Sequence, residues 1–413
     1  MTQQRRSFPV DSVSILFLSL LRREHTNLFR FSMELRQPVC PDALQLAVDR
    51  VWHRCPTVAA GVRQGFFHYR VVHAEAPPRA MRDPGLLLTM SRQEMETCAL
   101  RVYYEDCTIS IEVFHALTDG FGAITTLVTL VSEYLAIKSG LEVPPGELRL
   151  DMSLAPDSRE MEDSFLPLAK EKPWHLPSRY SYLPPRPADT DWQIRVASMT
   201  VPTAPLLDTA HRYGVTLNTL LTAAMASAIM EQQLRHGHKR LKPVRIMVPV
   251  NLRRMFGSRS LRNFALYGLP TMEPEDRVLS MEELCRSFDA QIKSHFTREK
   301  MAAMSAYNVR MQNGWFFRIL PWKLKSAAMK LGYRFFGESN SSLTLTNLGR
   351  AALPEELIPH IAGMQLYMTP RQGSPYGCAI LSFGETLTVN ISKFTRDKEL
   401  ETLLFEKLRS MSE

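Results

Sequence analysis

Hydrophobic residues change their spacing abruptly near residue 115. From Thr108 to Phe114, branched aliphatic residues occupy every second position, which is the pattern of a half-buried strand. From 124 to 135, apolar residues recur at intervals of three and four, which indicates a helix, and Lys138-Ser-Gly140 is typical of a helix end. The pattern therefore predicts a strand and a helix joined by a short loop with little conformational freedom.

Similar patterns predict elements along the rest of the chain. They are a helix over 42–54, a strand pair around 98–114 with a turn at Glu105-Asp106, a strand over 193–201, helices over 203–213 and 216–234, a strand over 244–250, helices near 281–297 and 321–332, a strand over 342–347, a hairpin over 376–392 and a helix over 397–411. Seven prolines crowd a stretch without sustained periodicity, which is typical of a linker. We therefore predict an N-terminal lobe over 1–150, a proline-rich crossover linker over 151–192 and a C-terminal lobe over 193–413.

The composition is typical of a soluble globular protein. The 413 residues suffice for two domains of ordinary size, and 45% of them are apolar and 22% charged. No apolar run approaches the roughly 18–20 residues that span a bilayer. The apolar run over 13–21 has no small-residue cleavage site after it, and the six cysteines form no Cys-x-x-Cys pair. We therefore expect a cytoplasmic protein without a transmembrane segment.

The net charge of +8 is distributed along the chain rather than gathered in one tail. A nucleic-acid-binding surface would need a basic stripe with exposed aromatic residues or a recognisable module, and the sequence has neither. His236-x-His238 lies in a polar run without an acidic or thiol residue close by, so a solvated loop is expected there rather than a metal site. We therefore expect no nucleic-acid partner and no bound metal.

The loop after the strand over 108–114 carries residues suited to proton transfer. His115 stands at the strand end, Asp119 follows four residues later, and Gly120 begins the helix. An unperturbed histidine has a pKa of about 6.5, so a neutral imidazole can accept a proton from a hydroxyl or amine near pH 7. Gly120 would serve the backbone turn, where a side chain would clash or φ is positive. This loop is therefore the candidate active site.

The motif His115-x-x-x-Asp119-Gly120 resembles the signature of the acyltransferase superfamily that includes chloramphenicol acetyltransferase, the condensation domains of peptide synthetases and bacterial alcohol acetyltransferases. Further segments resemble other elements of that superfamily, in the same order: Asp42–Pro56, Tyr213–Ala224, Pro249–Arg253 with Arg262–Phe264, and Thr346–Gly349. Condensation domains usually carry a second histidine before the motif, but here that residue is Phe114, and the plant-type Asp-Phe-Gly-Trp-Gly element is absent. The pattern is therefore closest to stand-alone bacterial alcohol acetyltransferases.

The resemblance implies an α/β fold of two chloramphenicol-acetyltransferase-like lobes, with mixed sheets, helices and an active-site tunnel between the lobes. It also implies transfer of an acyl group from a thioester to an alcohol or amine, with acyl-CoA as co-substrate and no bound cofactor. An acyl or peptidyl carrier protein is the alternative partner that would bring the acyl group. His115 would then be the general base. Some of the 50 Lys and Arg residues would line the mouth of the donor tunnel, or they would form an ordinary solvated surface.

The resemblance suggests supporting roles for other residues. Asp119 would be structural and ion-paired with Arg253 or Arg245. Thr346, or a backbone amide near it, would stabilise the tetrahedral oxyanion. Asn263 and Asn347 would either hold loops or contact the substrate in the tunnel.

Two alternatives stand beside acyl transfer. A binding or recruitment module would keep this fold without performing chemistry, as some members of the superfamily do. A serine hydrolase would need a nucleophilic serine, but the chain has no Gly-x-Ser-x-Gly elbow. The intact motif around His115 favours acyl transfer over both.

Overall fold

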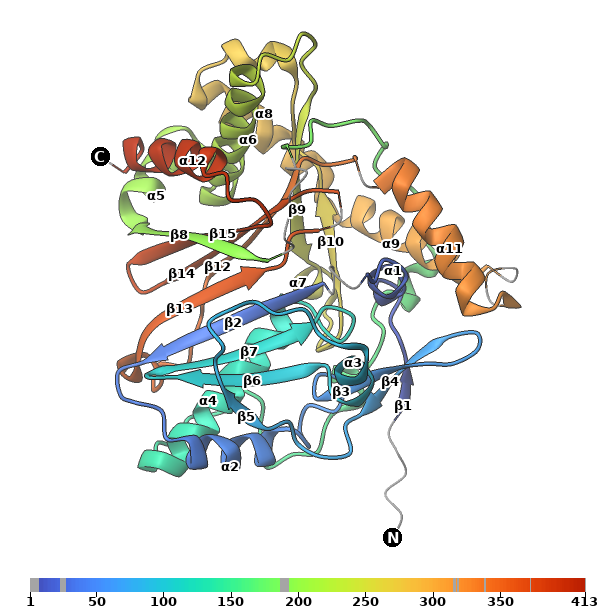
Figure 1. Ribbon diagram of the computed structural model, residues 1–413, viewed down its shortest axis with the longest axis vertical. Helices are drawn as coiled ribbons and strands as arrows, with labels where there is room; N and C mark the ends of the chain where they lie inside the picture. Colours follow the sequence, from blue (N-terminus) through green and yellow to red (C-terminus); the bar gives the residue numbers. More distant parts are fainter. Residues whose placement is uncertain are drawn as a thin grey trace.

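Two α/β lobes lie one above the other in the computed structural model, which describes residues 7–22, 27–185, 193–314, 317, 319–337, 339–371 and 373–412 (Figure 1). Strands from the first part of the chain, coloured blue to cyan, build most of the lower lobe, and strands coloured green to red build the upper lobe. Both lobes combine a mixed sheet with helices. The predicted fold class is therefore confirmed.

The lower lobe is organised around a five-stranded sheet in the order β13-β2-β7-β6-β5. Helices α2 (Pro41–Val51) and α4 (Gly120–Ser139) cover one face of this sheet (Figure 1). The strands are β2 (Leu28–Leu35), β5 (Ala80–Arg82), β6 (Leu100–Glu105), β7 (Thr108–Phe114) and β13 (Ile361–Met368). A smaller sheet and two short helices complete the lobe, namely β1 (Ser7–Pro9), β3 (Ala60–Gln64), β4 (Tyr69–His73), α1 (Ser14–Ser19) and α3 (Arg92–Thr97).

The upper lobe contains a seven-stranded sheet in the order β10-β9-β12-β14-β15-β8, with β11 paired to β9. Its strands are β8 (Arg195–Pro202), β9 (Val244–Asn251), β10 (Ala265–Gly268), β11 (Thr271–Met272), β12 (Leu343–Arg350), β14 (Tyr376–Phe383) and β15 (Thr386–Lys393). The helices of this half are α5 (Thr203–Arg212), α6 (Leu217–Arg235), α7 (Arg253–Phe256), α8 (Met281–His295), α9 (Arg298–Asn313), α11 (Trp322–Gly332) and α12 (Glu399–Ser410), with single turns at Pro274–Val278, Tyr333–Gly337 and Ile358–His360.

One strand joins the two lobes across the predicted boundary. β13 comes from the second half of the sequence, yet it pairs antiparallel with β2 in the lower sheet. The described part of the predicted linker, 151–185, contains two short 3-10 turns, Ser158–Glu160 and Leu166–Lys170. The division into 1–150, 151–192 and 193–413 stays a prediction. The strand order shows in addition that the chain returns from the upper lobe to the lower lobe after β12.

Every element expected from the hydrophobic pattern is present, and each of its ends lies within three residues of the expected position. The pattern missed β13 because the register between this strand and β2 shifts between Ile361 and Gly363, which breaks the alternation of buried and exposed positions. It also missed α9, whose apolar residues do not form a single well-defined face. The pattern also gave no prediction for β2, β3 and β4 in the lower lobe. Local periodicity thus located many of the elements and left others unpredicted, including the regular strand β2.

Helix α4 is long and apolar enough to cross a membrane, so the expectation that no segment reaches this length is wrong. Within its most apolar window, 78% of the residues are buried inside the fold, and they belong to the core of the lower lobe. Helices α5 and α6 pass the same test only as a pair that is bent by 90°. The composition of α4 is explained by its position in the core, and the cytoplasmic location stays a prediction.

Candidate active site

His115 follows directly after β7 and lies between two aromatic rings. Phe17 of α1 stacks on the imidazole with 4.3 Å between ring centroids, and Phe29 of β2 meets it edge-on at 4.9 Å. The backbone N–H of His115 donates a hydrogen bond to the carbonyl oxygen of Asn27 at 3.0 Å. The residue keeps a fraction of its surface exposed, although protein atoms surround most of the ring. Packing therefore fixes the orientation of the imidazole.

The amide of Asn263 determines which imidazole nitrogen carries the proton. Its Nδ2 lies 3.1 Å from Oδ2 of Asp11 and 2.9 Å from the carbonyl oxygen of His115, and both of these oxygens are acceptors. Asn263 therefore turns its Oδ1, which is also an acceptor, toward Nδ1 of His115 at 3.2 Å. Nδ1 must donate this hydrogen bond, so Nε2 is the nitrogen with the lone pair.

Burial lowers the pKa of His115 below its ordinary value of 6.5. A hydrogen bond to its own backbone carbonyl, the charge of Asp119, the hydrogen bond with Asn263 and the charge of Asp11 act in the opposite direction without offsetting burial. The imidazole is therefore neutral near pH 7, which is the form that can accept a proton.

Asp119 uses both carboxylate oxygens to hold the structure around the motif. Its Oδ1 accepts hydrogen bonds from the N–H groups of Phe121 at 3.1 Å and Gly122 at 3.3 Å, and thereby caps α4. Its Oδ2 accepts from Nη1 of Arg253 and from the N–H of Phe264, both at 2.8 Å. Both members of the ion pair are almost fully buried. Asp119 therefore ties the start of α4 to the segment that follows β9.

Arg245 was the other candidate partner for Asp119, and this alternative is wrong. Its Nη1 donates to Oδ1 of Asn340 at 2.6 Å, and its Nη2 to the carbonyl oxygen of Pro177 at 3.3 Å. Burial lowers the pKa of Arg245 to about 10, and the charge of Arg179 acts in the same direction. Arg245 thus belongs to a separate contact between β9 and the predicted linker.

The two glycines at the start of α4 differ in how much space surrounds them. Gly120 does not have a positive φ, and a Cβ there would come 3.2 Å from a terminal methyl of Leu348, a flexible neighbour. A Cβ on Gly122 would lie 2.1 Å from both the carbonyl oxygen of Leu261 and Oγ1 of Thr118. The close approach of backbone to backbone therefore requires glycine at 122 and not at 120, contrary to the expectation for Gly120.

We expect Gly122→Ala to lower the free energy of unfolding by at least about 2 kcal/mol, because the backbone at Leu261 cannot move aside as a side chain would. Gly120→Ala is the matched control and should change it by less than about 1 kcal/mol. Urea denaturation of both variants measures the difference. Equal stabilities of the two variants would show that the close approach at Gly122 carries no energetic weight.

The end of β12 approaches the motif from the other lobe. The side chain of Leu348 lies beside Gly120, because a Cβ at Gly120 would come 3.2 Å from one of its methyls, and this places the segment Thr346–Gly349 next to the start of α4. Oδ1 of Asn347 accepts a hydrogen bond from the N–H of Gly349 at 2.9 Å, and Gly349 has a φ of +70°. Asn347 therefore holds a turn, and Thr346 precedes it with a partly exposed side chain.

Sequence reasoning missed the acidic residues behind Asn263. Asp11 is fully buried, and its Oδ1 accepts from Oγ of Ser14 at 2.6 Å. Oδ2 of Asp163 accepts from both the N–H and the Oγ of Ser12 at 3.0 Å. Burial and the charge of Asp11 raise the pKa of Asp163 to about 6. The only signal in the sequence was Asp11 itself, a charged residue just before an apolar run.

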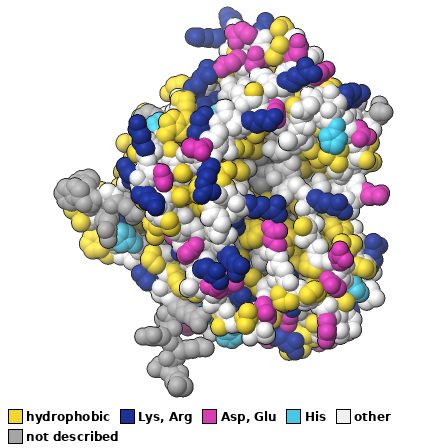
Figure 2. Space-filling view, turned by 180° about the vertical axis from the view of Figure 1, so that it is seen from behind, with side chains coloured by type: hydrophobic (Ala, Val, Ile, Leu, Met, Phe, Trp, Pro, Cys, Tyr) yellow, Lys and Arg dark blue, Asp and Glu magenta, His cyan; other side chains and the backbone are white. Residues whose placement is uncertain are grey.

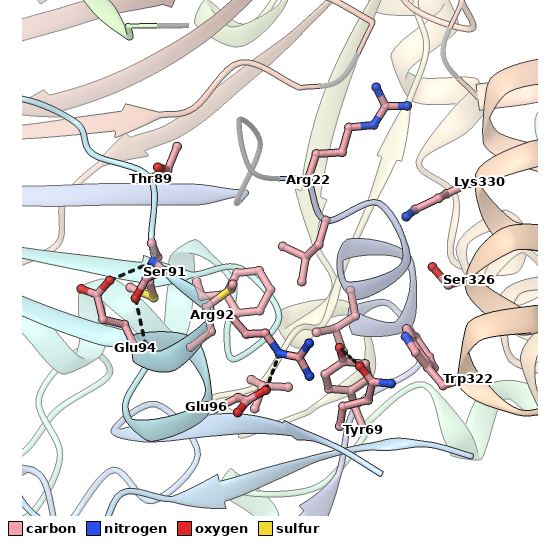
Figure 3. Close-up of a pocket in the computed structure, with 17 residues that line it drawn as sticks. Arg22, Tyr69, Thr89, Ser91, Arg92, Glu94, Glu96, Trp322, Ser326 and Lys330 are labelled. Carbon is pink, nitrogen blue, oxygen red and sulfur yellow. Dashed lines mark hydrogen bonds and ion pairs between the residues drawn. The ribbon is translucent and has the colours of Figure 1, made fainter. Parts of the chain in front are cut away.

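A cavity of about 710 Å³ lies beside the site (Figure 3). Apolar side chains, including Leu18, Phe114 and Trp322, line part of it, while Arg22 and Lys330 lie together on one side (Figure 3). Phe114 immediately precedes His115, but His115 is not among the described residues that line the cavity. The tunnel that was expected to reach the imidazole therefore stays a prediction.

Within the described residues, no group of three or more His, Cys, Asp or Glu side chains could hold a metal ion. The rings of His236 and His238 are 6.4 Å apart, and Nε2 of His236 lies 2.8 Å from a carboxylate oxygen of Glu399 in α12. The expectation that this pair lacks an acidic neighbour is wrong, because Glu399 is 163 residues away in sequence.

Comparisons with known proteins find this fold but no close relative. No family model and no curated protein matches the sequence. Among solved structures, a trichothecene 15-O-acetyltransferase from Fusarium sporotrichioides is 11% identical with a TM-score of 0.61, over 100% of this chain and 96% of that chain. A wax ester synthase/diacylglycerol acyltransferase from Marinobacter aquaeolei is 13% identical with a TM-score of 0.55, over 98% of both chains.

The first condensation domain of the CDA synthetase is 12% identical with a TM-score of 0.60, over 100% of this chain and 96% of that chain. These similarities extend over nearly the whole chain. They show that it has the two-lobed fold shared by condensation domains and acyltransferases of this kind, and they confirm the resemblance at the level of the fold.

Proposed function

We propose that this protein is an acyltransferase that moves an acyl group from a thioester to an alcohol or amine, with His115 as the general base. The observation that carries the proposal is the state of the imidazole. It is neutral near pH 7, Asn263 engages Nδ1, and no described residue forms a hydrogen bond with Nε2. The similarity in fold to proteins named as acetyltransferase and acyltransferase supports the same reaction class.

In the proposed reaction, Nε2 of His115 removes the proton from the acceptor as its oxygen or nitrogen attacks the thioester carbonyl. The imidazolium then donates this proton to the thiolate that leaves, so the enzyme ends in its starting state. Asn263 keeps Nδ1 as a hydrogen-bond donor throughout. A donor group at the end of β12, either the Thr346 hydroxyl or a nearby amide, would stabilise the oxyanion, since Leu348 brings this segment to the motif.

The proposed donor is acyl-CoA, because its phosphates are suited to a basic protein. A screen of acetyl-CoA and longer acyl-CoAs against alcohols and amines, monitored by release of free thiol, tests the function directly. Acceptor-dependent thiol release is the expected result. If thiol is released only from an acylated carrier protein, the carrier protein and not acyl-CoA is the donor. If thiol is released from neither donor class, acyl transfer by this protein is excluded.

The rate should depend on pH in the way that a base with a lowered pKa dictates. We expect kcat/KM to fall as the pH drops, with a midpoint below 6.5, because burial keeps His115 neutral at that pH. Asp163 has a pKa of about 6, so Asp163→Asn serves as the control for its titration. A midpoint at or above 6.5, or one that disappears in Asp163→Asn, would contradict the assignment to His115.

A binding module without catalysis is the second candidate, and the position of the cavity favours it. The cavity is lined by Phe114 rather than His115, and Phe17 and Phe29 pack on the imidazole. Such a module would bind an acyl-CoA or a small apolar molecule without turnover. Calorimetric binding of the ligand, combined with no thiol release in the screen, would establish this function instead.

A further inference from the structure

Helix α11 has an inverted distribution of apolar and charged residues. Leu324 and Leu331 are 56% and 57% exposed, whereas Lys325 between them is only 2% exposed. Ala327, Ala328 and Phe335 are also exposed and continue the stripe at helical spacing. A helix that only covered a core would turn its leucines inward. The exposed stripe therefore indicates a surface that meets an apolar environment.

The turn between β3 and β4 extends this stripe. Phe66 and Phe67 are 72% and 43% exposed, and their rings meet edge-on at 4.8 Å. The backbone N–H of Trp322 donates to the carbonyl oxygen of Phe66, and Nζ of Lys325 donates to that of Phe67, both at 2.9 Å. The turn and the helix are therefore fixed to one another. In Figure 1 they lie at the same side of the molecule.

Basic residues flank the exposed apolar side chains. Lys323, Lys330 and Arg334 are exposed, and none of them forms an ion pair with a carboxylate of the described residues. The exposed residues from 322 to 335 include three Lys or Arg residues and no Asp or Glu. In Figure 2, seen from behind, basic and hydrophobic side chains lie near one another along the left edge, with some acidic side chains among them. The local charge is therefore positive.

We propose that this surface docks on an anionic lipid bilayer. We call it the α11 surface and define it by Phe66, Phe67, Leu324, Leu331, Phe335, Lys323, Lys330 and Arg334. Apolar side chains that protrude between basic ones insert into the interfacial region of a bilayer, while the cations attract anionic headgroups. A second copy of the chain is a poorer occupant, because a twofold contact would bring the same cations face to face.

The cavity lies directly behind the α11 surface. Trp322, Ser326 and Lys330 of α11 line it (Figure 3), while Leu324 and Leu331 of the same helix are exposed. The helix therefore separates the cavity from the proposed lipid surface. This arrangement suits an amphipathic ligand, and docking on lipid does not depend on acyl transfer being the reaction.

Vesicle flotation with the full chain tests the proposal. We expect the protein to float with vesicles of phosphatidylcholine and phosphatidylglycerol, and to float less with phosphatidylcholine alone or at high salt. The double variant Leu324→Ser/Leu331→Ser should bind the anionic vesicles about tenfold more weakly. Leu154→Ser/Val278→Ser is the matched control, since these residues are 60% and 80% exposed but lie outside the α11 surface, and it should bind like the wild type.

Circular dichroism tests whether each variant keeps its fold. If Leu324→Ser/Leu331→Ser unfolds, Phe66→Ser/Phe67→Ser provides an independent pair of substitutions in the same surface. No flotation of the wild type, or equal flotation of the wild type and both pairs of variants, would overturn the proposal. Reversible dimerisation in sedimentation velocity that Leu324→Ser/Leu331→Ser abolishes, without vesicle binding, would assign the surface to a second copy instead.

Discussion

His115→Ala should retain its fold and lose acyl transfer, with kcat lower by about 10²–10⁴. The expected loss corresponds to removal of one general base from a site that still positions both substrates. Phe17 and Phe29 pack on the imidazole, so a modest loss of stability is also expected and is measured separately by urea denaturation. Turnover is measured by thiol release with the best donor and acceptor from the screen.

The matched control for this variant is His211→Ala. His211 is an exposed histidine on α5 in the upper lobe, so its removal changes the histidine content without touching the motif. It should leave kcat unchanged. A folded His115→Ala protein with near-wild-type turnover would end the assignment of His115 as the base and would require another group for proton transfer.

Asp119→Asn should cost about 3–5 kcal/mol of the free energy of unfolding, because it leaves the guanidinium of Arg253 buried without a counter-charge. In the wild type, the backbone N–H of Phe264 donates to Oδ2 of Asp119. In the variant, the NH2 group of the asparagine can take the place of Oδ2, and two hydrogen-bond donors would then face each other. Urea denaturation measures the loss. Turnover per folded molecule should fall less than it does in His115→Ala.

Asp157→Asn is the control, since Asp157 also caps a helical turn and pairs with an arginine, Arg159, but does so at the surface. Its stability should stay close to that of the wild type, because water screens exposed ion pairs. If Asp119→Asn melted like the wild type and yet lost turnover, Asp119 would take part in the chemistry rather than hold the structure.

The location of the motif was accessible from the sequence because the relevant information is local. The alternation before His115 and the helical spacing after Gly120 report burial of neighbouring positions, and β7 and α4 lie where that spacing predicts. The length of the loop between them follows directly. The same reasoning failed at Gly122, where the need for glycine comes from Leu261, a residue that is distant in sequence.

The sequence by itself determined many of the elements, the fold class and the histidine at a strand end, but not β2, β13 or α9. Only the tertiary structure decided that Arg253 rather than Arg245 meets Asp119, and that Asn263 contacts His115 across 148 residues. The physical reason is that periodicity records which positions are buried, but not which buried groups face one another. The proton position on His115 depends on such a pairing, because Asp11 orients the amide of Asn263, so it emerged only with the fold.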